Sequence, residues 1–444
     1  MTLLEFSTEN TYLLNSLWVF LAAVLVFLMQ AGFACCESGF ARSKSAVNIW
    51  MKNAVDFCVG ALIYYFIGFG LMYGDDFMGI VGINGFINPL SQNLAVWDGL
   101  GLSREAFILF QTVFCATAAT IISGSVAERF KFNSYIIVSV VMTGFIYPVV
   151  GHWIWGGGWL SSLGFVDYAG SAAVHCVGAF ASLVGASMVG ARYGKYTKGD
   201  KGEIVVNAIP KHNIPMIGLG VFILWFGWYG FNPGSGLALD ENTFYTAITT
   251  TYAAAAGGLA GLFTSWGRDK HPDMLLSLNG ALGGLVAICS GVNSVSIVGS
   301  IIIGALAGTA LVFSDRFVEC VLKVDDPVGA LSVHGCSGII GVLAVGLFAC
   351  RETDTMGLFY GGGIMPFLIQ LLGIVAVAAF VLLSSTALFA ILKATLGIRV
   401  DLKEEIEGLD INEHAIRAYA YGEKLVIPMP KVPASVEEET PPVS

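Results

Sequence analysis

The sequence predicts an all-α integral membrane protein in which two inverted five-helix halves are followed by a long eleventh transmembrane helix. Of the 444 residues, 56% are hydrophobic and only 12% are charged, and the mean hydropathy is +0.75. Soluble domains carry about 25% charged residues, so a chain with half that share must expose much of its surface to lipid. Long apolar stretches recur along the chain, and the motif D-x-x-G-x-x-x-V-H occurs twice.

The apolar stretches define the expected helices. A transmembrane helix needs about 20 mostly apolar residues. Eleven stretches come near this length, at residues 14–36, 52–73, 106–127, 134–155, 170–191, 213–231, 244–266, 274–290, 293–314, 332–350 and 362–396. The last is long enough to tilt or to continue beyond the bilayer. Glu5 and Glu9, rather than Lys or Arg, precede the first stretch, so we expect a span and not a signal peptide.

Basic residues predict the orientation and the domain boundaries. Twenty Lys and Arg residues fall in one set of alternate loops and in the C-terminal stretch, whereas Arg104 and Arg351 fall in the other set. Because Lys and Arg favour cytoplasmic loops, we expect the N-terminus outside, the C-terminus inside and an odd number of spans. Residues 1–397 would form the transmembrane domain. Residues 398–444 would form a cytoplasmic tail, whose proline-rich, acidic last part is expected to be disordered.

Each copy of the repeated motif places a histidine eight residues after an aspartate, His175 after Asp167 and His334 after Asp326. Asp167 begins the fifth stretch from the outside, and Asp326 begins the tenth from the inside. Eight helical residues of about 1.5 Å each bring either histidine about 12 Å into a hydrocarbon layer about 30 Å thick. Inverted-repeat transporters bind their substrates near this depth, between the halves.

The symmetry of the two histidines favours function over structure. A lone histidine in a span could equally form an interhelical hydrogen bond, but ionisable residues there usually mark a functional site. The aspartates occupy positions typical of helix N-caps. For Asp326 we expect only this structural role, whereas Asp167 could also act at the outer mouth.

Other classes of protein are not supported. The nine cysteines lack the paired spacing of a zinc site, and no basic patch of the kind that binds nucleic acid is present. The glycine-rich stretches lack the Lys-Ser/Thr ending of a phosphate loop. We therefore expect no cofactor, no metal and no nucleic-acid partner.

Longer motifs surround the histidines. They are QAGFACCESGFARSK, FQTVF, HWIWGGG, DYAG, WYGFNPGSG, DDPVGALSVHG and, near the C-terminus, EGLDINEH. With these motifs, the chain resembles the ammonium transporter (Amt/Mep/Rh) family over nearly its whole length. The resemblance implies a channel-like transporter of ammonium or methylammonium in the cell membrane and not an enzyme. It also implies a homotrimer with one pore per subunit, to which a PII signal protein could bind at the cytoplasmic face.

The resemblance further implies roles for residues that would follow one another along the pore. They are Asp167 at the outer mouth, Phe114, Trp155 and Ser235 in a recruitment site, Phe114 and Phe231 in a gate, and the pore histidines His175 and His334. The pair Trp155 and Ser235 is typical of the Amt branch. Without the family pattern, Trp155 could be an interfacial residue, Ser235 a turn residue, and the phenylalanines ordinary core.

Two positions depart from the family pattern. Cys289 stands where some relatives carry Thr near the pore lining, which lowers the polarity there and introduces a modifiable thiol. Asn412 stands where plant relatives carry a phosphorylatable Thr, so we expect no phosphorylation switch at this position.

The implied mechanism agrees with the physical chemistry. Aromatic faces attract cations by about 0.5–2 kcal/mol, and a hydroxyl oxygen accepts a hydrogen bond that ammonium can donate and potassium cannot. An apolar passage rejects bare ions, but ammonium can release its proton and continue as ammonia. Neutral imidazoles offer this ammonia one donor and one acceptor each, and burial disfavours their charged form.

Two alternatives remain open at this point. The protein could be an ammonium sensor with little flux, or a membrane cytochrome in which His175 and His334 are axial haem ligands.

Overall fold

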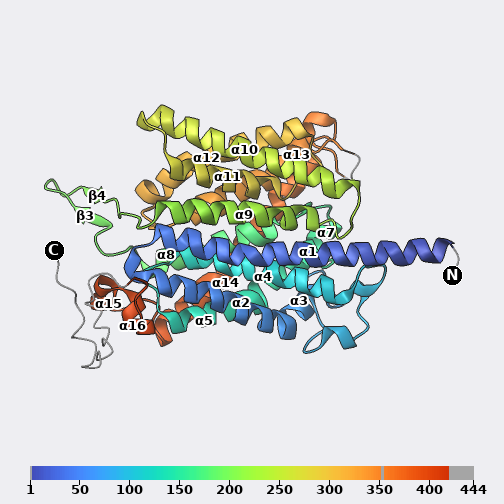
Figure 1. Ribbon diagram of the computed structural model, residues 1–444, viewed down its shortest axis with the longest axis horizontal. Helices are drawn as coiled ribbons and strands as arrows, with labels where there is room; N and C mark the ends of the chain where they lie inside the picture. The colour runs from blue at the N-terminus through green and yellow to red at the C-terminus, as the bar shows by residue number, and fades with distance from the viewer. Residues whose placement is uncertain (1–2, 352–354, 420–444) are drawn as a thin grey trace, which may run out of the picture.

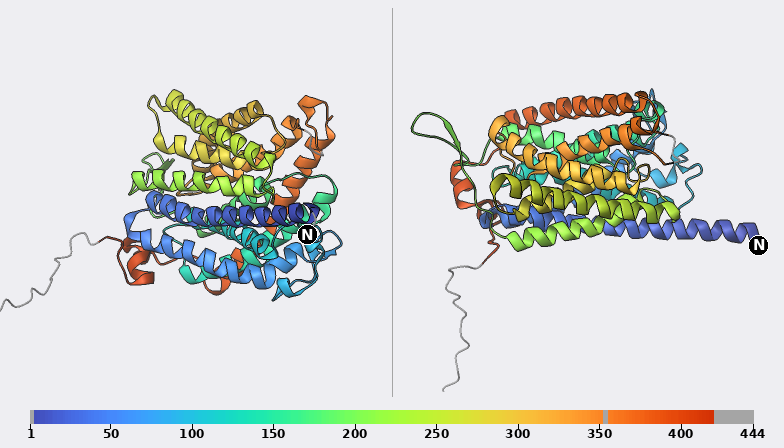
Figure 2. Two further views of the ribbon diagram at one scale, coloured as in Figure 1. Left: turned by 45° about the vertical axis from the view of Figure 1, so that its right-hand side comes forward. Right: turned by 90° about the horizontal axis from the view of Figure 1, so that it is seen from above.

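The computed structural model describes residues 3–351 and 355–419, and these form a bundle of roughly parallel helices (Figure 1). The N-terminus lies at one end of the bundle, and the last described helices lie at the other. Figure 2 shows the same common helix direction from above, with the start of the first helix projecting beyond its neighbours. This confirms the all-α fold class. The end of the expected cytoplasmic tail, residues 420–444, lies outside the described residues.

The first half of the chain contains the elements up to Val189. Its α-helices are α1 (Leu3–Phe40), α2 (Ala46–Ile63), α3 (Phe69–Tyr73), α4 (Arg104–Ser125), α5 (Phe132–Val141), α6 (Tyr147–Ile154), α7 (Trp159–Ser162) and α8 (Val177–Val189). The π-helical turn η2 (Tyr64–Gly68) joins α2 to α3, and η5 (Met142–Ile146) joins α5 to α6. A third π-helical turn, η6 (Ser171–Cys176), precedes α8. A short hairpin of β1 (Asp76–Phe77) and β2 (Val81–Gly82) follows α3.

The second half begins after a hairpin of β3 (Tyr196–Lys198) and β4 (Ile204–Val206). Its helices are α9 (Ile214–Gly234), α10 (Glu241–Asp269), α11 (Met274–Ile288), α12 (Ile297–Arg316) with its π-helical extension η7 (Phe317–Leu322), and α13 (Ser337–Phe348) preceded by the π-helical turn η8 (Leu331–Cys336). The long helix α14 (Met365–Thr395) and the short helices α15 (Leu402–Glu407) and α16 (Leu409–His414) complete the described chain.

All eleven predicted stretches coincide with helices. Among the described residues, nine helices are long and apolar enough to cross a membrane. The two other stretches form α10, which is rich in Thr, Ala and Gly, and α11, which has 15 residues. That these two also span the bilayer, giving eleven, stays a prediction.

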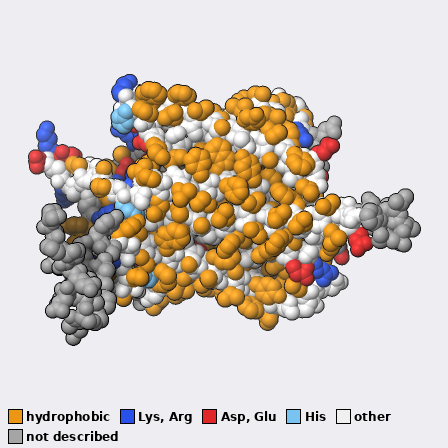
Figure 3. Space-filling view, viewed as in Figure 1, with side chains coloured by type: hydrophobic (Ala, Val, Ile, Leu, Met, Phe, Trp, Pro, Cys, Tyr) orange, Lys and Arg blue, Asp and Glu red, His pale blue; other side chains and the backbone are white. Residues whose placement is uncertain are grey.

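The surface matches a membrane environment. Hydrophobic side chains cover the middle of the face in Figure 3, and charged side chains gather at its two ends. Inside, glycines allow α10, α11 and α12 to approach closely. A side-chain carbon added at Gly308 would lie 2.1 Å from the Gly257 carbonyl oxygen, and one at Gly284 would lie 2.3 Å from that of Ala253. Such approach through small residues is typical of membrane helices.

The first helices of the two halves, α1 and α9, lie side by side and run in opposite directions (Figure 1). The Asn213 amide at the start of α9 donates to the Gly39 carbonyl oxygen near the end of α1, over 3.2 Å. Beyond the other end of α9, the Leu239 amide donates to Asn15 Oδ1 over 3.0 Å. This antiparallel pairing agrees with the predicted inversion of the two halves.

The start of the C-terminal tail is docked rather than solvated. Its residue Glu405 is buried, accepts a hydrogen bond from the Tyr193 amide over 2.6 Å and forms an ion pair with Arg399 over 2.7 Å. In α16, Asp410 accepts from the Asn48 amide over 2.9 Å. The tail therefore packs against the start of α2 and the loop that follows α8.

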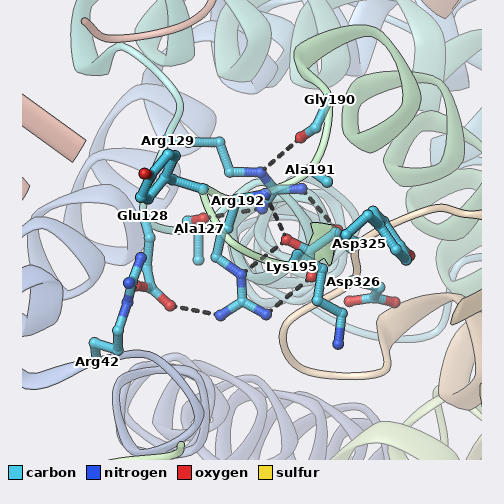
Figure 4. A network of polar contacts seen from close by, with 12 residues as sticks. Arg42, Ala127, Glu128, Arg129, Gly190, Ala191, Arg192, Lys195, Asp325 and Asp326 are labelled. Carbon is cyan, nitrogen blue, oxygen red and sulfur yellow. Dashed lines mark hydrogen bonds and ion pairs between the residues drawn. The ribbon is translucent and has the colours of Figure 1, made fainter. Parts of the chain in front are cut away.

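A buried ionic network ties the loops together at this end of the bundle (Figure 4). Arg192 donates two hydrogen bonds to the Asp325 carboxylate, both 2.9 Å long, and a third to Glu128 over 2.6 Å. Glu128 also pairs with Arg42, and Arg129 donates to the Asp325 carbonyl oxygen over 2.7 Å. The network thus connects the loops that follow α1, α4 and α8 with the loop that precedes η8.

The charges of this network compensate one another. Burial alone would raise the pKa of the Asp325 carboxyl, but the hydrogen bonds from Arg192 and the charges of Arg129 and Arg192 hold that pKa well below its usual value. The pKa of Glu128 is lowered against the effect of burial by Arg192 and Arg42. Both carboxylates therefore depend on the Arg192 guanidinium.

We expect Arg192→Ala to lower the free energy of unfolding by about 3–5 kcal/mol, because it leaves buried carboxylates without their partner. Thermal unfolding in detergent measures this loss. The control is Lys403→Ala, which removes an exposed pair with Glu407 at 3.8 Å and should cost at most about 1 kcal/mol. Equal losses in the two variants would contradict the central role of Arg192.

Candidate functional site

The repeated D-x-x-G motif forms the same structure in both halves. The carboxylate of Asp167 accepts hydrogen bonds from the amides of Gly170, Ala172 and Ala173 and from the Ser290 hydroxyl, over 3.2, 2.9, 2.8 and 2.6 Å. These bonds satisfy the free amides at the start of η6. Gly170 has a φ of +104°, a left-handed conformation that favours glycine.

Asp326 acts in the same way in the second half. Its carboxylate accepts from the amides of Val328, Gly329 and Leu331 over 3.3, 3.1 and 2.8 Å, and Gly329 has a φ of +76°. Burial raises the pKa of both aspartates, against the effect of these hydrogen bonds. Both aspartates therefore cap a helix, as expected for Asp326. Four donors fill the acceptor sites of Asp167, which argues against a direct contact with substrate at the outer mouth.

The caps bring the two histidines together. Helix η6 begins only at Ser171 and η8 at Leu331. Each histidine therefore lies in the first helical turn, and not about 12 Å along a helix that begins at the aspartate, as the sequence predicted. His175 Nδ1 lies 3.2 Å from His334 Nδ1, and the stacked rings have centroids 5.1 Å apart. Both side chains are buried. At this distance the two nitrogens share one hydrogen bond, so only one of them carries a proton.

A continuous series of aromatic rings leads away from His175. Phe231 stacks on His175 with a centroid distance of 5.4 Å, and Phe114 stacks on Phe231 at 4.1 Å. Trp155 meets Phe114 edge-on at 6.2 Å, and its Nε1–H donates to the Asp167 carbonyl oxygen over 2.7 Å. The structure thus brings together the predicted gate, the histidines and two of the predicted recruitment residues.

Ser235, the third predicted recruitment residue, caps the C-terminus of α9, one turn beyond Phe231. Its hydroxyl donates to the Phe231 carbonyl oxygen over 2.7 Å, and the side chain is half-buried. Because the hydroxyl proton is engaged with the backbone, the oxygen lone pairs face outward as acceptors. A hydroxyl in this state can accept a hydrogen bond from a cation with N–H groups.

On the other side of the histidine pair, two cavities lead toward the tail end of the bundle. The first has a volume of about 30 Å³ and is lined by His334 and Phe33, among others. The second, of about 280 Å³, is lined by charged side chains of the loops at the tail end, including Arg192, Lys195 and Asp326. Asn279 and Val328 line both cavities, which are therefore adjacent.

Sequence reasoning missed two aromatic neighbours of the histidines. Trp228 stacks on His175 with a centroid distance of 5.3 Å, and Phe33 lies 6.2 Å from His334. Cys289, noted above as unusual, is 3.7 Å from His175 Nε2 and accepts a 3.2 Å hydrogen bond from Trp228 Nε1. Trp228 is one helical turn before Phe231 on α9, and this spacing was the signal available in the sequence.

Comparison with known proteins identifies the family of this chain. Residues 17–419 match the Ammonium Transporter Family. This chain belongs to that family. It is 41% identical to the ammonium transporter Amt2 of Archaeoglobus fulgidus over 431 residues, which cover 93% of this chain and 89% of the relative. The resemblance noted in the sequence is therefore confirmed, and this member of the ammonium transporter family is a multi-pass membrane transporter and not an enzyme.

Solved structures of the family share the fold. A sensor Amt protein superposes with a TM-score of 0.85 at 38% identity, covering 91% of this chain and 99% of that protein. The Mep2 protein of Candida albicans superposes with a TM-score of 0.79 at 27% identity, covering 89% of this chain and 88% of that protein.

We expect Asp167→Asn to lower the free energy of unfolding by about 1–3 kcal/mol, because either orientation of the amide turns an NH₂ group toward backbone or hydroxyl donors. The matched control is Asp240→Asn, at the N-cap of α10, where Asn caps about as well as Asp. Thermal unfolding compares the two variants. Wild-type stability of Asp167→Asn combined with weaker ammonium affinity would instead indicate a charge that acts at the outer mouth.

Proposed function

We propose that this protein carries ammonium, and also methylammonium, across the cell membrane by recruiting the cation, removing its proton and passing ammonia along the histidine pair. The observation that carries this proposal is the 3.2 Å contact between His175 and His334, buried at the end of a series of stacked aromatic rings. Each part of the mechanism is supported by a separate feature of this arrangement.

Recruitment would take place where Trp155, Phe114 and Ser235 lie. The rings of Trp155 and Phe114 attract a cation by about 0.5–2 kcal/mol, and the Ser235 oxygen accepts one of its N–H groups. Phe114 and Phe231, stacked at 4.1 Å, would then act as the gate. These rings must move apart before a molecule can reach His175.

Deprotonation accounts for selectivity. Directly beyond the gate, the rings of Trp228 and Phe231 stack on the buried His175, and a bare ion there loses tens of kcal/mol of hydration free energy. Potassium keeps its charge and is rejected, whereas ammonium can leave its proton behind. The imidazole pair offers donors and acceptors to ammonia and passes the proton along the shared Nδ1–Nδ1 hydrogen bond.

The position of the histidines speaks against the cytochrome alternative. A haem iron with two axial imidazoles requires its macrocycle between the rings, whereas here the rings are stacked and the Nδ1 atoms are in hydrogen-bond contact. The sensor alternative predicts binding without flux, so a transport measurement separates it from the proposal.

The assembly and orientation are part of the proposal. We infer a homotrimer with one pore per subunit, surrounded by membrane lipid, with the N-terminus outside and residues 398–444 in the cytoplasm. The termini of the described chain lie at opposite ends of the bundle, which supports an odd number of spans (Figure 1). The large cavity at the tail end, of about 280 Å³, would open to the cytoplasm. A PII signal protein is a candidate partner at that face.

An ammonium pulse on proteoliposomes in solid-supported-membrane electrophysiology tests the function. We expect a transient current with ammonium and none with potassium, because the charge crosses as a released proton. Uptake of labelled methylammonium without current would indicate passage of ammonia alone. Binding of ammonium without current or uptake would refute transport and leave the sensor alternative.

We expect His334→Ala to lower the ammonium current about tenfold or to admit potassium, since a positioned proton-transfer group contributes about 10²–10⁴-fold and water can enter the vacated space. The matched control is His271→Ala, in an exposed loop, which should behave as the wild type. Unchanged current and unchanged potassium exclusion in His334→Ala would remove the histidine pair from the mechanism.

A further inference from the structure

A carboxyl group lies next to the histidine pair on its tail side. Glu37 follows Phe33 by one turn on the same face of α1, and the Phe33 ring is 6.2 Å from that of His334. Glu37 and His334 both line the cavity of about 30 Å³, and Glu37 is only 3% exposed. A buried carboxyl in a membrane span is costly unless it has a partner or a function.

The cavity is large enough to connect the two groups. A water molecule needs about 10–15 Å³ of such volume, so about 30 Å³ holds one or two. Apart from Cys36 and Asn279, the other lining side chains are apolar. Water in this space would therefore find its hydrogen-bond partners mainly at the His334 imidazole and the Glu37 carboxyl.

The surroundings of Glu37 do not explain it as part of an ion pair. The charged groups that face it come from α2, namely Lys52 and Asp56, and the Ser123 hydroxyl of α4 lies nearby. Lys52 Nζ donates to the Ser123 carbonyl oxygen over 2.9 Å, and the ion pairs among the described residues do not include Glu37. Asn53 Nδ2 donates to Glu37 Oε2 over 3.1 Å.

The charges of this cluster allow Glu37 to take up a proton. Asp56 accepts hydrogen bonds from the hydroxyls of Tyr135, over 2.7 Å, and Ser139. Both hydroxyl donors favour the ionised form of Asp56, whose charge the Lys52 ammonium can compensate. A second carboxylate would leave a surplus negative charge in a buried site, which is unfavourable. Glu37 is therefore the member of the cluster that can gain and lose a proton.

We propose that Glu37 is the inner proton-transfer residue of the pore, an inference that rests on the proposed function. After ammonium has given its proton to the histidine pair, an N–H bond of His334 breaks while a cavity water takes this proton and passes one of its own to the Glu37 carboxylate, where an O–H bond forms. Ammonia arriving from the pore then forms an N–H bond as the Glu37 O–H bond breaks. Ammonium leaves through the large cavity, and the next deprotonation recharges the histidine pair.

The test compares Glu37 variants in proteoliposomes. We expect Glu37→Gln to lower the initial ammonium-evoked current about tenfold, because a positioned proton-transfer group contributes about 10²–10⁴-fold and cavity water retains part of that role. Glu37→Asp keeps a carboxyl group, so it should restore most of the current and shift its pH profile. Glu407→Gln, which removes a carboxylate near the surface of the tail, is the control and should match the wild type.

The outcomes separate this inference from the proposed function. Wild-type current and pH profile in Glu37→Gln would overturn the role of Glu37 while leaving transport intact. If Glu37→Gln does not fold, the pH profile of Glu37→Asp decides, and an unchanged profile overturns the inference. A wild-type protein without ammonium-dependent current or uptake would overturn the proposed function itself, and the inference with it.

Discussion

The hydrogen bond between His175 and His334 is the constraint on which the rest of the site depends. Two imidazoles from opposite halves of the chain face each other through like nitrogens, 3.2 Å apart. Only one proton fits between them, so the tautomer of one ring determines that of the other. The stacked rings of Trp228 and Phe231 fix the plane of His175 and keep water away, which favours the uncharged pair.

The capped backbone around the two histidines determines where their side chains lie. Each histidine lies in a π-helical turn whose first amides are bound by an aspartate. In the second half, Asp326 follows Asp325, which Arg192 and Arg129 hold in the ionic network. Arg399 of the tail donates a hydrogen bond to the carbonyl oxygen of Ala191, the residue before Arg192, over 2.8 Å. These contacts connect the loop that precedes η8, and so the start of the helix that carries His334, to the loops and the tail at that end.

Local patterns made most of the fold predictable from sequence. Apolar runs located all eleven helical stretches, and the repeated D-x-x-G motif placed both histidines, because N-capping and left-handed glycine are local requirements. The helix start was predicted less well, since the capped loop takes up four residues before η6 begins. The composition of α10 makes it hard to recognise as a transmembrane helix, because its small residues serve close packing rather than contact with lipid.

Contacts between distant segments could not be predicted in this way. Phe33 on α1 lies next to His334 on η8, and no spacing in the sequence relates these two helices to one another. The docking of Glu405 depends on Tyr193 and Arg399 for the same reason. Only the packed structure shows that a carboxyl of α1 shares a cavity with His334.

The two sides of the histidine pair differ in their chemistry. Rings and a single hydroxyl precede His175, and these can attract a cation but cannot hold a proton. Beyond His334 lie Glu37 and a cavity with several charged side chains. A proton that leaves the pair toward the tail therefore finds an ionisable group at once, whereas one that returns toward Phe231 must find a new ammonia. This asymmetry determines which groups in the pore can bind a proton. The gradients of ammonium and charge across the membrane still determine the direction of net flow.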